Sequence, residues 1–578
     1  MSRKTHPESE RYVSRLSPLL ESNAGKTLSD NSSGFDSGLT RGLQLQEEGH
    51  RLPVAIFLAG NELPSIGADL RMNADAATLA NLLSDEFATR PAVIIPGGSV
   101  VTHGQLREQV FRLADTLRRG GVESQATVSI VLPNGLEFLA TFLATTCAGA
   151  VAAPLNSAYK AEEFKFYMED AQSRAVIVPQ GPHPARDAAA QLNLPVWEAS
   201  LDADGGVQLE RINGSAAKPQ ATSNGPRGDD VALFLHTSGT TSRPKGVPLT
   251  HANLMASIRN IVATYALTPE DTSLIVMPLF HVHGLIGATL STLLSGGTVI
   301  IPPSFSATKF WPAALEHRAT WYSAVPTIHQ ILLSRADADG APRSGLRFIR
   351  SCSAALAPAV FAQLEERFGA PVLEAYGMTE ASHQMSSNPL PAAGPRKPGS
   401  VGRGTGVEIV ILDEKGNVLP NGQQGEVSIK GRNVMHGYRN NPDANASSFT
   451  SGYFRTGDQG VLDTDNYLTL TGRLKELINR GGEKISPLEV DAVLLEHPAV
   501  AEAVSFAVPD PKYGEEVHGA VVLKGAAEAD DIVAFCKGRL ADFKVPKKIH
   551  IADALPRTAT GKIQRRHVAA HFLKLGSK

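Results

Sequence analysis

The sequence has few cysteines, no long apolar run and almost no net charge, and each shortage excludes a class of protein. Its three cysteines, Cys147, Cys352 and Cys536, lie far apart and lack metal-ligand spacing, which favours free thiols in a reducing compartment over a disulfide framework. No His-bearing signature stands near Cys352, so a catalytic thiol is not favoured there. A formal net charge of −3 at pH 7 gives no basic footprint for nucleic acid or an anionic membrane.

Targeting and membrane signals are also missing. Apolar runs such as "LPVAIFLAG" fall short of the ~20 residues that span a bilayer and are short enough to be strands. The first residues, "MSRKTHPESERYVSR", contain no apolar signal core, and the last three, "GSK", differ from the peroxisomal "SKL". We therefore expect a cytoplasmic protein without a membrane partner, and a peroxisomal location stays open.

The chain of 578 residues is too long for one hydrophobic core, so two or more domains are expected. Residues 1–76 are rich in polar and small residues and weakly periodic, which predicts a disordered extension; a transit peptide is the alternative. From about residue 77, helical patterns alternate with strand-like runs such as "ALFLH", "TSLIVMP", "GGTVIIP" and "ATWYSAVP". This alternation predicts an α/β fold with doubly wound, largely parallel sheets over residues 77–471. Segments shorten beyond that point, which predicts a small α+β domain over residues 476–578.

What the sequence does have is an unusual loop, "HTSGTTSRPKG", directly after a probable strand. Its small residues leave backbone N–H groups unshielded, and its hydroxyls and one lysine add donors that suit a polyphosphate. The lysine is followed by "GVPLTH", another probable strand, so the loop does not fit a Walker A motif, in which the lysine opens a helix. A flexible surface loop is the alternative. The candidate phosphate-binding residues are Thr237, Ser238, Gly239, Thr240, Thr241 and Lys245.

Further motifs follow this loop in a fixed order. "YGMTE" stands at 376–380, "TGD" at 456–458, "GRLKELI" at 472–478 and "PRTATGKIQRR" at 556–566. Together with "TSGTTSRPKG" they resemble the motif set of the AMP-forming acyl-CoA synthetases and their adenylating relatives. The resemblance implies a large AMP-binding domain and a mobile C-terminal domain joined by a hinge at 472–475. It also implies ATP, Mg²⁺ and coenzyme A as the small molecules that the enzyme uses.

The resemblance gives each nucleotide motif a role. Tyr376 would offer a flat face for adenine, Thr379 would contact the α-phosphate, and Glu380 with Thr240 would hold Mg²⁺. Asp458 would accept hydrogen bonds from the ribose hydroxyls, beside Arg473 on the ribose and phosphate side. Taken alone, a Thr-Glu pair is typical of a helix cap and an aspartate in "TGD" is typical of a turn.

The C-terminal motifs carry the catalytic candidates. Lys562 would neutralise the charge that builds when a carboxylate attacks the α-phosphate, although a lone lysine in a basic tail is usually solvated. Lys475 occupies the hinge position. Gly481 and Gly482 would allow close approach of the pantetheine arm, and a plain β-turn is the alternative there.

The segments that the family uses for its acid pocket are rich in donors. "PLFHVHGL", "IRSCSAAL" and the residues after "YGMTE" contribute His281, His283, Arg350, Ser351, Ser353 and His383. Burying an aliphatic tail there would leave donors unpaired at ~1–3 kcal/mol each, so a small acid with a second charge is favoured. "TWYSAVPTIHQIL" and "TEASHQMSSNPLP" resemble the oxalate–CoA ligase branch, which implies oxalate. The alternatives are a 4-coumarate–CoA ligase-like or medium-chain enzyme and, in a different class, a luciferase-like oxygenase.

Overall fold

The large domain contains a seven-stranded sheet. The computed structural model describes residues 77–202, 204–213, 225–237, 244–341, 343, 345–557 and 563–576, so the predicted extension over 1–76, with "LPVAIFLAG", lies outside the described residues. The strand order is β7-β6-β5-β3-β4-β8-β9, parallel except at the pairs β6–β7 and β8–β9. Its strands are β3 Thr127–Ile130, β4 Val151–Pro154, β5 Ser173–Pro179, β6 Val196–Leu201, β7 Val207–Arg211, β8 Val231–Thr237 and β9 Lys245–Thr250.

A second, nine-stranded sheet follows the order β16-β15-β14-β13-β12-β10-β11-β1-β2. It is parallel from β14 to β1 and antiparallel at both edges. The two sheets confirm the predicted α/β fold. The strands are β1 Pro91–Ile94, β2 Val100–Thr102, β10 Thr272–Leu274, β11 Thr298–Ile300, β12 Trp321–Ala324, β13 Phe348–Ser351, β14 Val372–Met378, β15 His383–Ser387 and β16 Arg403–Gly404.

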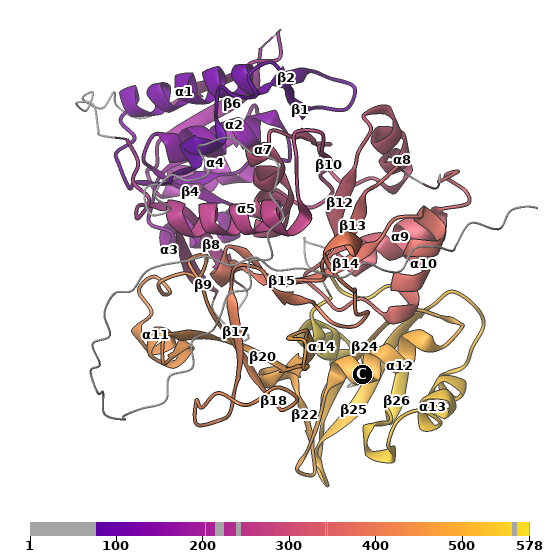
Figure 1. Ribbon diagram of the computed structural model, residues 1–578. Coiled ribbons are helices and arrows are strands. Elements are labelled where there is room, and N and C mark those ends of the chain that lie inside the picture. Colours follow the sequence, from indigo (N-terminus) through magenta and orange to yellow (C-terminus); the bar gives the residue numbers. More distant parts are fainter. Residues whose placement is uncertain are drawn as a thin grey trace, which may run out of the picture. The chain divides into compact units, whose positions relative to one another are not determined.

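Helices cover both faces of the two sheets (Figure 1). The largest apolar core joins α1 His103–Arg119, α2 Leu136–Cys147 and α5 His251–Tyr265 to residues of both sheets. A second core places α8 Ala307–Glu316, α9 Pro326–Arg335 and α10 Pro358–Phe368 on the nine-stranded sheet, and a third places α3 Ala161–Asp170 and α4 Pro184–Gln191 on the seven-stranded sheet. Burial of these apolar faces supplies most of the driving force for this layered arrangement.

The local sequence explains where these helices begin and which face they bury. Thr102 accepts a hydrogen bond from the backbone N–H of Gln105 and starts α1 as a capping box. Leu106, Val110 and Leu113 repeat at helical spacing and are buried. Before β1, the segment "ATLANLLSDEFATRP" forms a single helical turn, η2 Leu79–Leu82.

A smaller antiparallel sheet closes the large domain, which the alternation of helices and strands did not predict. It contains β17 Glu408–Leu412, β18 Gln424–Lys430, β19 Phe449–Thr450, β20 Tyr453–Leu462 and β21 Leu468–Arg473, with α11 Pro442–Ser448 before β19. Its residues join the main apolar core through Ile411, Val427 and Leu468. The "TGD" and "GRL" motifs therefore lie on strands that are packed against the large domain.

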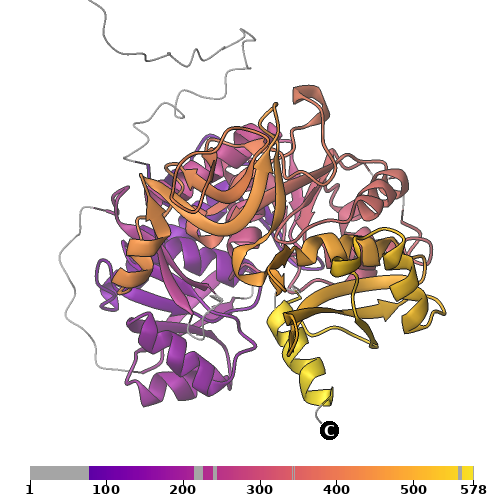
Figure 2. The same cartoon turned by 90° about the horizontal axis from the view of Figure 1, so that it is seen from below.

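The segment after β21 forms another sheet with its own core. Its elements are β22 Ile478–Arg480, β23 Glu483–Ile485, α12 Pro487–Glu496, β24 Val500–Asp510, β25 Gly514–Leu523, α13 Ala529–Lys537, β26 Lys548–Ile551 and α14 Arg565–Gly576. One face packs against α12 and α13 and the other against α14, as Figure 2 shows. This is the small α+β unit that the sequence predicts. None of the helices in the described part of the chain has the length and hydropathy needed to cross a bilayer.

Candidate active site

One cavity of about 930 Å³ collects most of the described motifs. Its wall comes from residues at the carboxyl ends of β4, β8, β12 and β14 and from β18 and β20, and such strand ends are where α/β proteins place ligands. The predicted site residues on this wall are Thr237, Lys245, His281, Ser353, Thr379, Glu380, His383, Arg473 and Lys475.

Apart from Gly481 and Gly482 of the C-terminal domain, the remaining predicted residues fall into two groups. Five are buried and do not line the cavity: His283, Arg350, Ser351, Tyr376 and Asp458. Ser238, Gly239, Thr240, Thr241 and Lys562 lie outside the described residues, so their predicted roles stay predictions.

At one part of the wall a buried carboxylate faces a lysine. Glu380 Oε1 accepts a hydrogen bond of 2.9 Å from the Tyr438 hydroxyl, and Lys245 Nζ lies 4.4 Å from the centre of the Tyr438 ring. Burial raises the pKa of Glu380, while Tyr438, Arg473 and Lys245 act in the opposite direction. Burial, together with the nearby Lys475, lowers the pKa of Lys245. The cavity therefore holds charges whose hydration has been removed.

Asp458 is held between two partners behind this wall. Its Oδ2 accepts a hydrogen bond from the Tyr376 hydroxyl, and its Oδ1 accepts one of 2.8 Å from Arg473 Nε. Asp458 pairs with Arg473 across β20 and β21, and this ion pair raises the pKa of the guanidinium. The arrangement fixes the carboxylate, and Tyr376 is only 8 % exposed, so its hydroxyl anchors Asp458 while Gly377 and Met378 line the cavity.

The predicted acid-binding segments form another part of the same wall. His281, Ser353 and His383 line the cavity there. Burial lowers the pKa of His383 well below its ordinary value, and the nearby Arg350 lowers it further. The imidazole of His383 is therefore neutral at physiological pH and acts as a hydrogen-bonding group.

A buried polar cluster supports these three side chains. Arg350 Nη2 lies 3.0 Å from His383 Nε2, and Arg350 Nη1 donates to Ser323 Oγ at 2.9 Å. His283 Nε2 lies 2.7 Å from Ser323 Oγ, and His283 Nδ1 lies 3.0 Å from Ser353 Oγ. The rings of His283 and His383 stack with their centres 5.2 Å apart. Arg350 and His283 therefore do not line the cavity themselves, and hydrogen bonds connect them to His383 and Ser353, which do.

The comparisons with known proteins agree with this geometry. Residues 84–439, more than half of the chain, match the AMP-binding enzyme family, and residues 489–562 match the AMP-binding enzyme C-terminal domain. The chain belongs to the AMP-binding enzyme family. It is 52 % identical to an oxalate–CoA ligase of Arabidopsis thaliana over 86 % of this chain and 99 % of that protein. It is 47 % identical to an oxalate–CoA ligase of Saccharomyces cerevisiae over 86 % and 98 %.

A solved structure in the family is also similar. The crystal structure of ATP-bound MatB from Rhodopseudomonas palustris matches with a TM-score of 0.76 and 31 % identity, over 86 % of this chain and 99 % of that chain. The match extends through both domains of the present chain.

The residues present fit the Mg²⁺ that enzymes of this family use with ATP. Glu380 is a buried carboxylate that accepts hydrogen bonds from the Tyr438 hydroxyl and from its own backbone N–H, and burial raises its pKa more than these donors and the nearby cations lower it. Mg²⁺ is usually bound by one or two carboxylates together with phosphate and water oxygens, so a single carboxylate facing the cavity suffices. Glu380 is therefore the described residue that would hold the ion.

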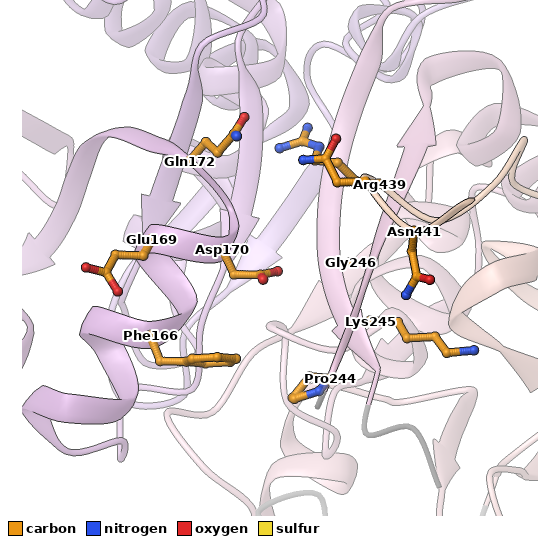
Figure 3. Close-up of a pocket in the computed structure, with 10 residues that line it drawn as sticks. Phe166, Glu169, Asp170, Gln172, Pro244, Lys245, Gly246, Arg439 and Asn441 are labelled. Atoms are coloured by element: carbon orange, nitrogen blue, oxygen red, sulfur yellow. The ribbon is translucent and has the colours of Figure 1, made fainter. Parts of the chain in front are cut away.

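A smaller pocket of about 540 Å³ lies beside the main cavity (Figure 3). Glu169 and Asp170 line it from α3, and Arg439 and Asn441 line it from the segment before α11. Lys245 lines both pockets, and Figure 3 shows its side chain directed away from Asp170. The pocket is therefore next to the strand that carries the predicted phosphate-binding lysine.

In the C-terminal domain, Gly481 and Gly482 occupy the turn between β22 and β23. Their φ angles are +62° and +98°, a region that side chains disfavour, so the turn itself requires glycine. The predicted contact with pantetheine stays a prediction.

Sequence reasoning missed several residues that complete the site. Tyr438 bonds Glu380, and Tyr265, Ser323 and Gln384 bond Arg350. These residues carry no motif of their own, although Gln384 directly follows His383. Only their positions in space connect them to the site.

Proposed function

We propose that this protein is an ATP-dependent oxalate–CoA ligase. It joins oxalate to AMP with release of pyrophosphate, and then transfers the oxalyl group to coenzyme A with release of AMP. The observation that carries this proposal is the acid end of the cavity, which is lined by His281, Ser353 and His383. The 52 % identity to an oxalate–CoA ligase supports the same substrate.

In the first step an oxygen of one oxalate carboxylate attacks the α-phosphorus of ATP, and the bond from that phosphorus to pyrophosphate breaks. Both reactants are anions, so the step needs positive charge and donors placed where negative charge develops. Lys245, Arg473 and Thr379 line the cavity and supply these groups. Lys562, which lies outside the described residues, is the further cation that we expect to act in this step. Glu380 would hold the Mg²⁺ ion that offsets the charge of the phosphates.

In the second step the sulfur of coenzyme A attacks the acyl carbon of oxalyl-AMP. The thiol proton leaves, the mixed anhydride bond breaks, and AMP departs with both electrons of that bond. Negative charge now develops on the acyl oxygen, and donors on the cavity wall such as His281 can stabilise it. The distal carboxylate of oxalate takes no part in either step and is bound only for recognition.

The preference for one acid over another depends on whether the acid pairs the hydrogen-bond donors of the pocket. A methyl or methylene group against His383 and Ser353 would leave donors unpaired at about 1–3 kcal/mol each. A carboxylate accepts from both of them, since it offers about four lone-pair sites. The distal end of the pocket therefore selects for a second carboxylate.

The test is an acid panel with the purified protein, ATP, Mg²⁺ and coenzyme A, in which AMP formation is followed for acids from two to sixteen carbons. We expect oxalate to have the highest kcat/KM, and malonate, butyrate and 4-coumarate to follow at least about tenfold below it. A higher value for 4-coumarate or for a medium-chain acid would overturn the assignment. Oxygen uptake measured in the same reactions separates a ligase from a luciferase-like oxygenase, because the ligase consumes none.

A further inference from the structure

Arg350 is a fully buried cation without a carboxylate partner among the described residues. Its Nε donates to the Tyr265 hydroxyl at 2.7 Å, and its Nη2 donates to Gln384 Oε1 at 2.9 Å. The remaining partners are the Ser323 hydroxyl, the His383 ring and the Cys352 thiol. A buried charge that is bonded only to neutral groups is costly, so its retention needs a reason.

The first hydrogen-bond chain, Arg350–His383, has only one possible direction. A guanidinium carries donors and no acceptor, so the lone pair in the 3.0 Å contact belongs to His383 Nε2. The proton of the neutral imidazole is then on Nδ1. Because Nε2 faces Arg350 and the ring lines the cavity, the Nδ1–H group is the donor left to meet a ligand.

The second chain, Arg350–Ser323–His283–Ser353, has a direction for the same reason. Ser323 Oγ accepts from Arg350, and its own proton has one acceptor in reach, His283 Nε2 at 2.7 Å. The proton of His283 is then on Nδ1 and is donated to Ser353 Oγ at 3.0 Å. The hydroxyl proton of Ser353 remains, and Ser353 lines the cavity.

We propose that Arg350 is a positioning residue for acid selection, which fixes both chains in one protonation pattern. In that pattern the Nδ1–H group of His383 and the hydroxyl of Ser353 both face the cavity as donors. The buried charge of Arg350 polarises the hydrogen bonds of each chain and so strengthens the two donors at the cavity. A bound carboxylate is therefore stabilised by Arg350 although it does not contact the guanidinium. This inference rests on the proposed function, because the carboxylate is the distal one of oxalate.

The surrounding charges support a neutral, prearranged donor pair. The titratable groups that face the two imidazoles are Arg350, His281 and His329, with Tyr265 and Cys352 facing Arg350 itself, and no carboxylate is among them. Burial and the charge of Arg350 keep the pKa of both imidazoles well below the ordinary value. The donors therefore keep the same protonation throughout the physiological range of pH.

The backbone around His383 is built to hold this ring in place. His383 has a φ of +101°, a conformation that costs a non-glycine residue energy and often marks a functional site. A Cβ at Gly287 would lie 2.4 Å from the His383 ring, and one at Gly377 would lie 2.1 Å from its carbonyl oxygen. The two glycines leave the space that the strained residue occupies.

The test compares Arg350→Met with the wild type from pH 6 to pH 8, using ATP–pyrophosphate exchange and the best acid of the panel. Methionine keeps the length and removes the charge. At pH 8 we expect the KM for oxalate to rise about tenfold or more, with a smaller change in kcat. Burial is the largest cause of the low pKa of His383 and remains in the variant, so the raised KM should persist from pH 6 to pH 8. The wild-type KM should stay flat.

Two further variants separate positioning from folding. Arg347→Met removes another arginine, one that pairs with the buried Asp271 away from the cavity, and should lower Tm without raising the KM for oxalate. Ser323→Ala interrupts the second chain alone, so the KM should rise less than in Arg350→Met. A KM for Arg350→Met within about twofold of the wild type, or a loss in kcat alone, would overturn the proposal.

A measurement on the wild type decides the matter if Arg350→Met does not fold. Nitrogen NMR of ¹⁵N-histidine-labelled protein, with His383→Gln to assign the signal, should show His383 protonated on Nδ1. Protonation on Nε2 would refute the proposal. If the Nδ1 tautomer is found but oxalate is not activated, the proposed function fails while the role of Arg350 in setting the tautomer stands.

Discussion

At the scale of single residues, the contact between Tyr438 and Glu380 has a consequence for magnesium binding. Glu380 is desolvated, and the Tyr438 hydroxyl is its hydrogen-bond donor at 2.9 Å. Tyr438→Phe removes this donor, so the carboxylate becomes less stable and holds Mg²⁺ less well. A hydrogen bond to a charged group contributes about 1.5–3 kcal/mol, which predicts a KM for MgATP that is about ten- to a hundredfold higher.

The control for this variant is another tyrosine–glutamate pair. The Tyr453 hydroxyl donates to Glu408 on an exposed part of β17 and β20, away from the cavity. Tyr453→Phe should leave the KM for MgATP within about twofold of the wild type, because exposed interactions contribute little. An unchanged KM in Tyr438→Phe would show that Glu380 does not depend on this bond.

Glu374 gives a prediction about stability and pH. Burial raises the pKa of this carboxyl from its ordinary value to about 8, although the backbone N–H of Gly399 donates to it. The folded state therefore holds the proton that the unfolded state releases, and the free energy of unfolding falls as pH rises from about 4.5 to about 8. Glu374→Gln keeps an acceptor for Gly399 and cannot ionise, so we expect it to reduce that loss by about 2 kcal/mol.

The measurement is thermal unfolding of both proteins at pH 5 and pH 8. The drop in Tm between the two values should be smaller in Glu374→Gln than in the wild type. Glu366→Gln, on the exposed face of α10, is the matched control and should keep the wild-type drop. A drop of equal size in all three proteins would contradict the predicted ionisation of Glu374.

At the scale of elements, the helical segment after "PLFH" positions His383. A three-residue helix, α6 Val282–Gly284, continues as the π-helix η3 Leu285–Leu290 and ends as α7 Ser291–Leu294. π-helices are rare and are frequently found at functional sites. Gly287 lies within it, against the His383 ring. The wider turn of the π-helix and the missing side chain at Gly287 together allow η3 to lie against the His383 ring.

Gly287→Ala tests that arrangement. The new methyl group would lie 2.4 Å from the His383 ring, which is too close. The ring must therefore move, either away from Arg350 or further into the cavity. We expect kcat/KM for oxalate to fall about ten- to a hundredfold, and the preference for oxalate over butyrate to shrink. Gly345→Ala, with open space around its new Cβ, should keep the wild-type value. Equal losses for both acids in Gly287→Ala would show a defect of folding and not of acid selection.

The same elements show what the sequence could and could not predict. Apolar runs such as "ALFLH" and "TWYSA" predicted β8 and β12, because buried parallel strands read as continuous apolar segments. The acid pocket was predicted as a set of segments, but not which side chains face the cavity. All four residues of β13 are buried, so nothing in the pattern separates Arg350 from a residue on the wall.

The sequence also could not predict which side chains contact Arg350, because these contacts join residues that are far apart in the chain. Arg350 is 85 residues from Tyr265 and 33 from His383 in the sequence, and no local pattern encodes these contacts. The antiparallel sheet of β17 to β21 was missed for a related reason. Its strands follow turns and loops without the alternation of helix and strand that indicated the other two sheets.

At the scale of the whole molecule, the apolar cores divide where the hinge is predicted. Within the described residues, the clusters of the large domain end at Leu468 and those of the C-terminal domain begin at Ile478. No cluster contains residues from both sides. The predicted hinge, 472–475, falls between them, so a rotation there would open neither core.

A domain that rotates as a unit can bring different residues to one cavity in the two half-reactions, and this gives the prediction for Lys562. Only adenylation joins two anions, so only adenylation needs this lysine. Lys562→Ala should lower ATP–pyrophosphate exchange about a hundredfold or more, and should change thioester formation from preformed oxalyl-AMP by less than about threefold. Lys548→Ala removes an exposed lysine of β26 and should leave both half-reactions unchanged. Losses of similar size in the two half-reactions of Lys562→Ala would mean that the residue maintains the structure of its domain, because a group that acts in one conformation alone cannot slow both steps equally.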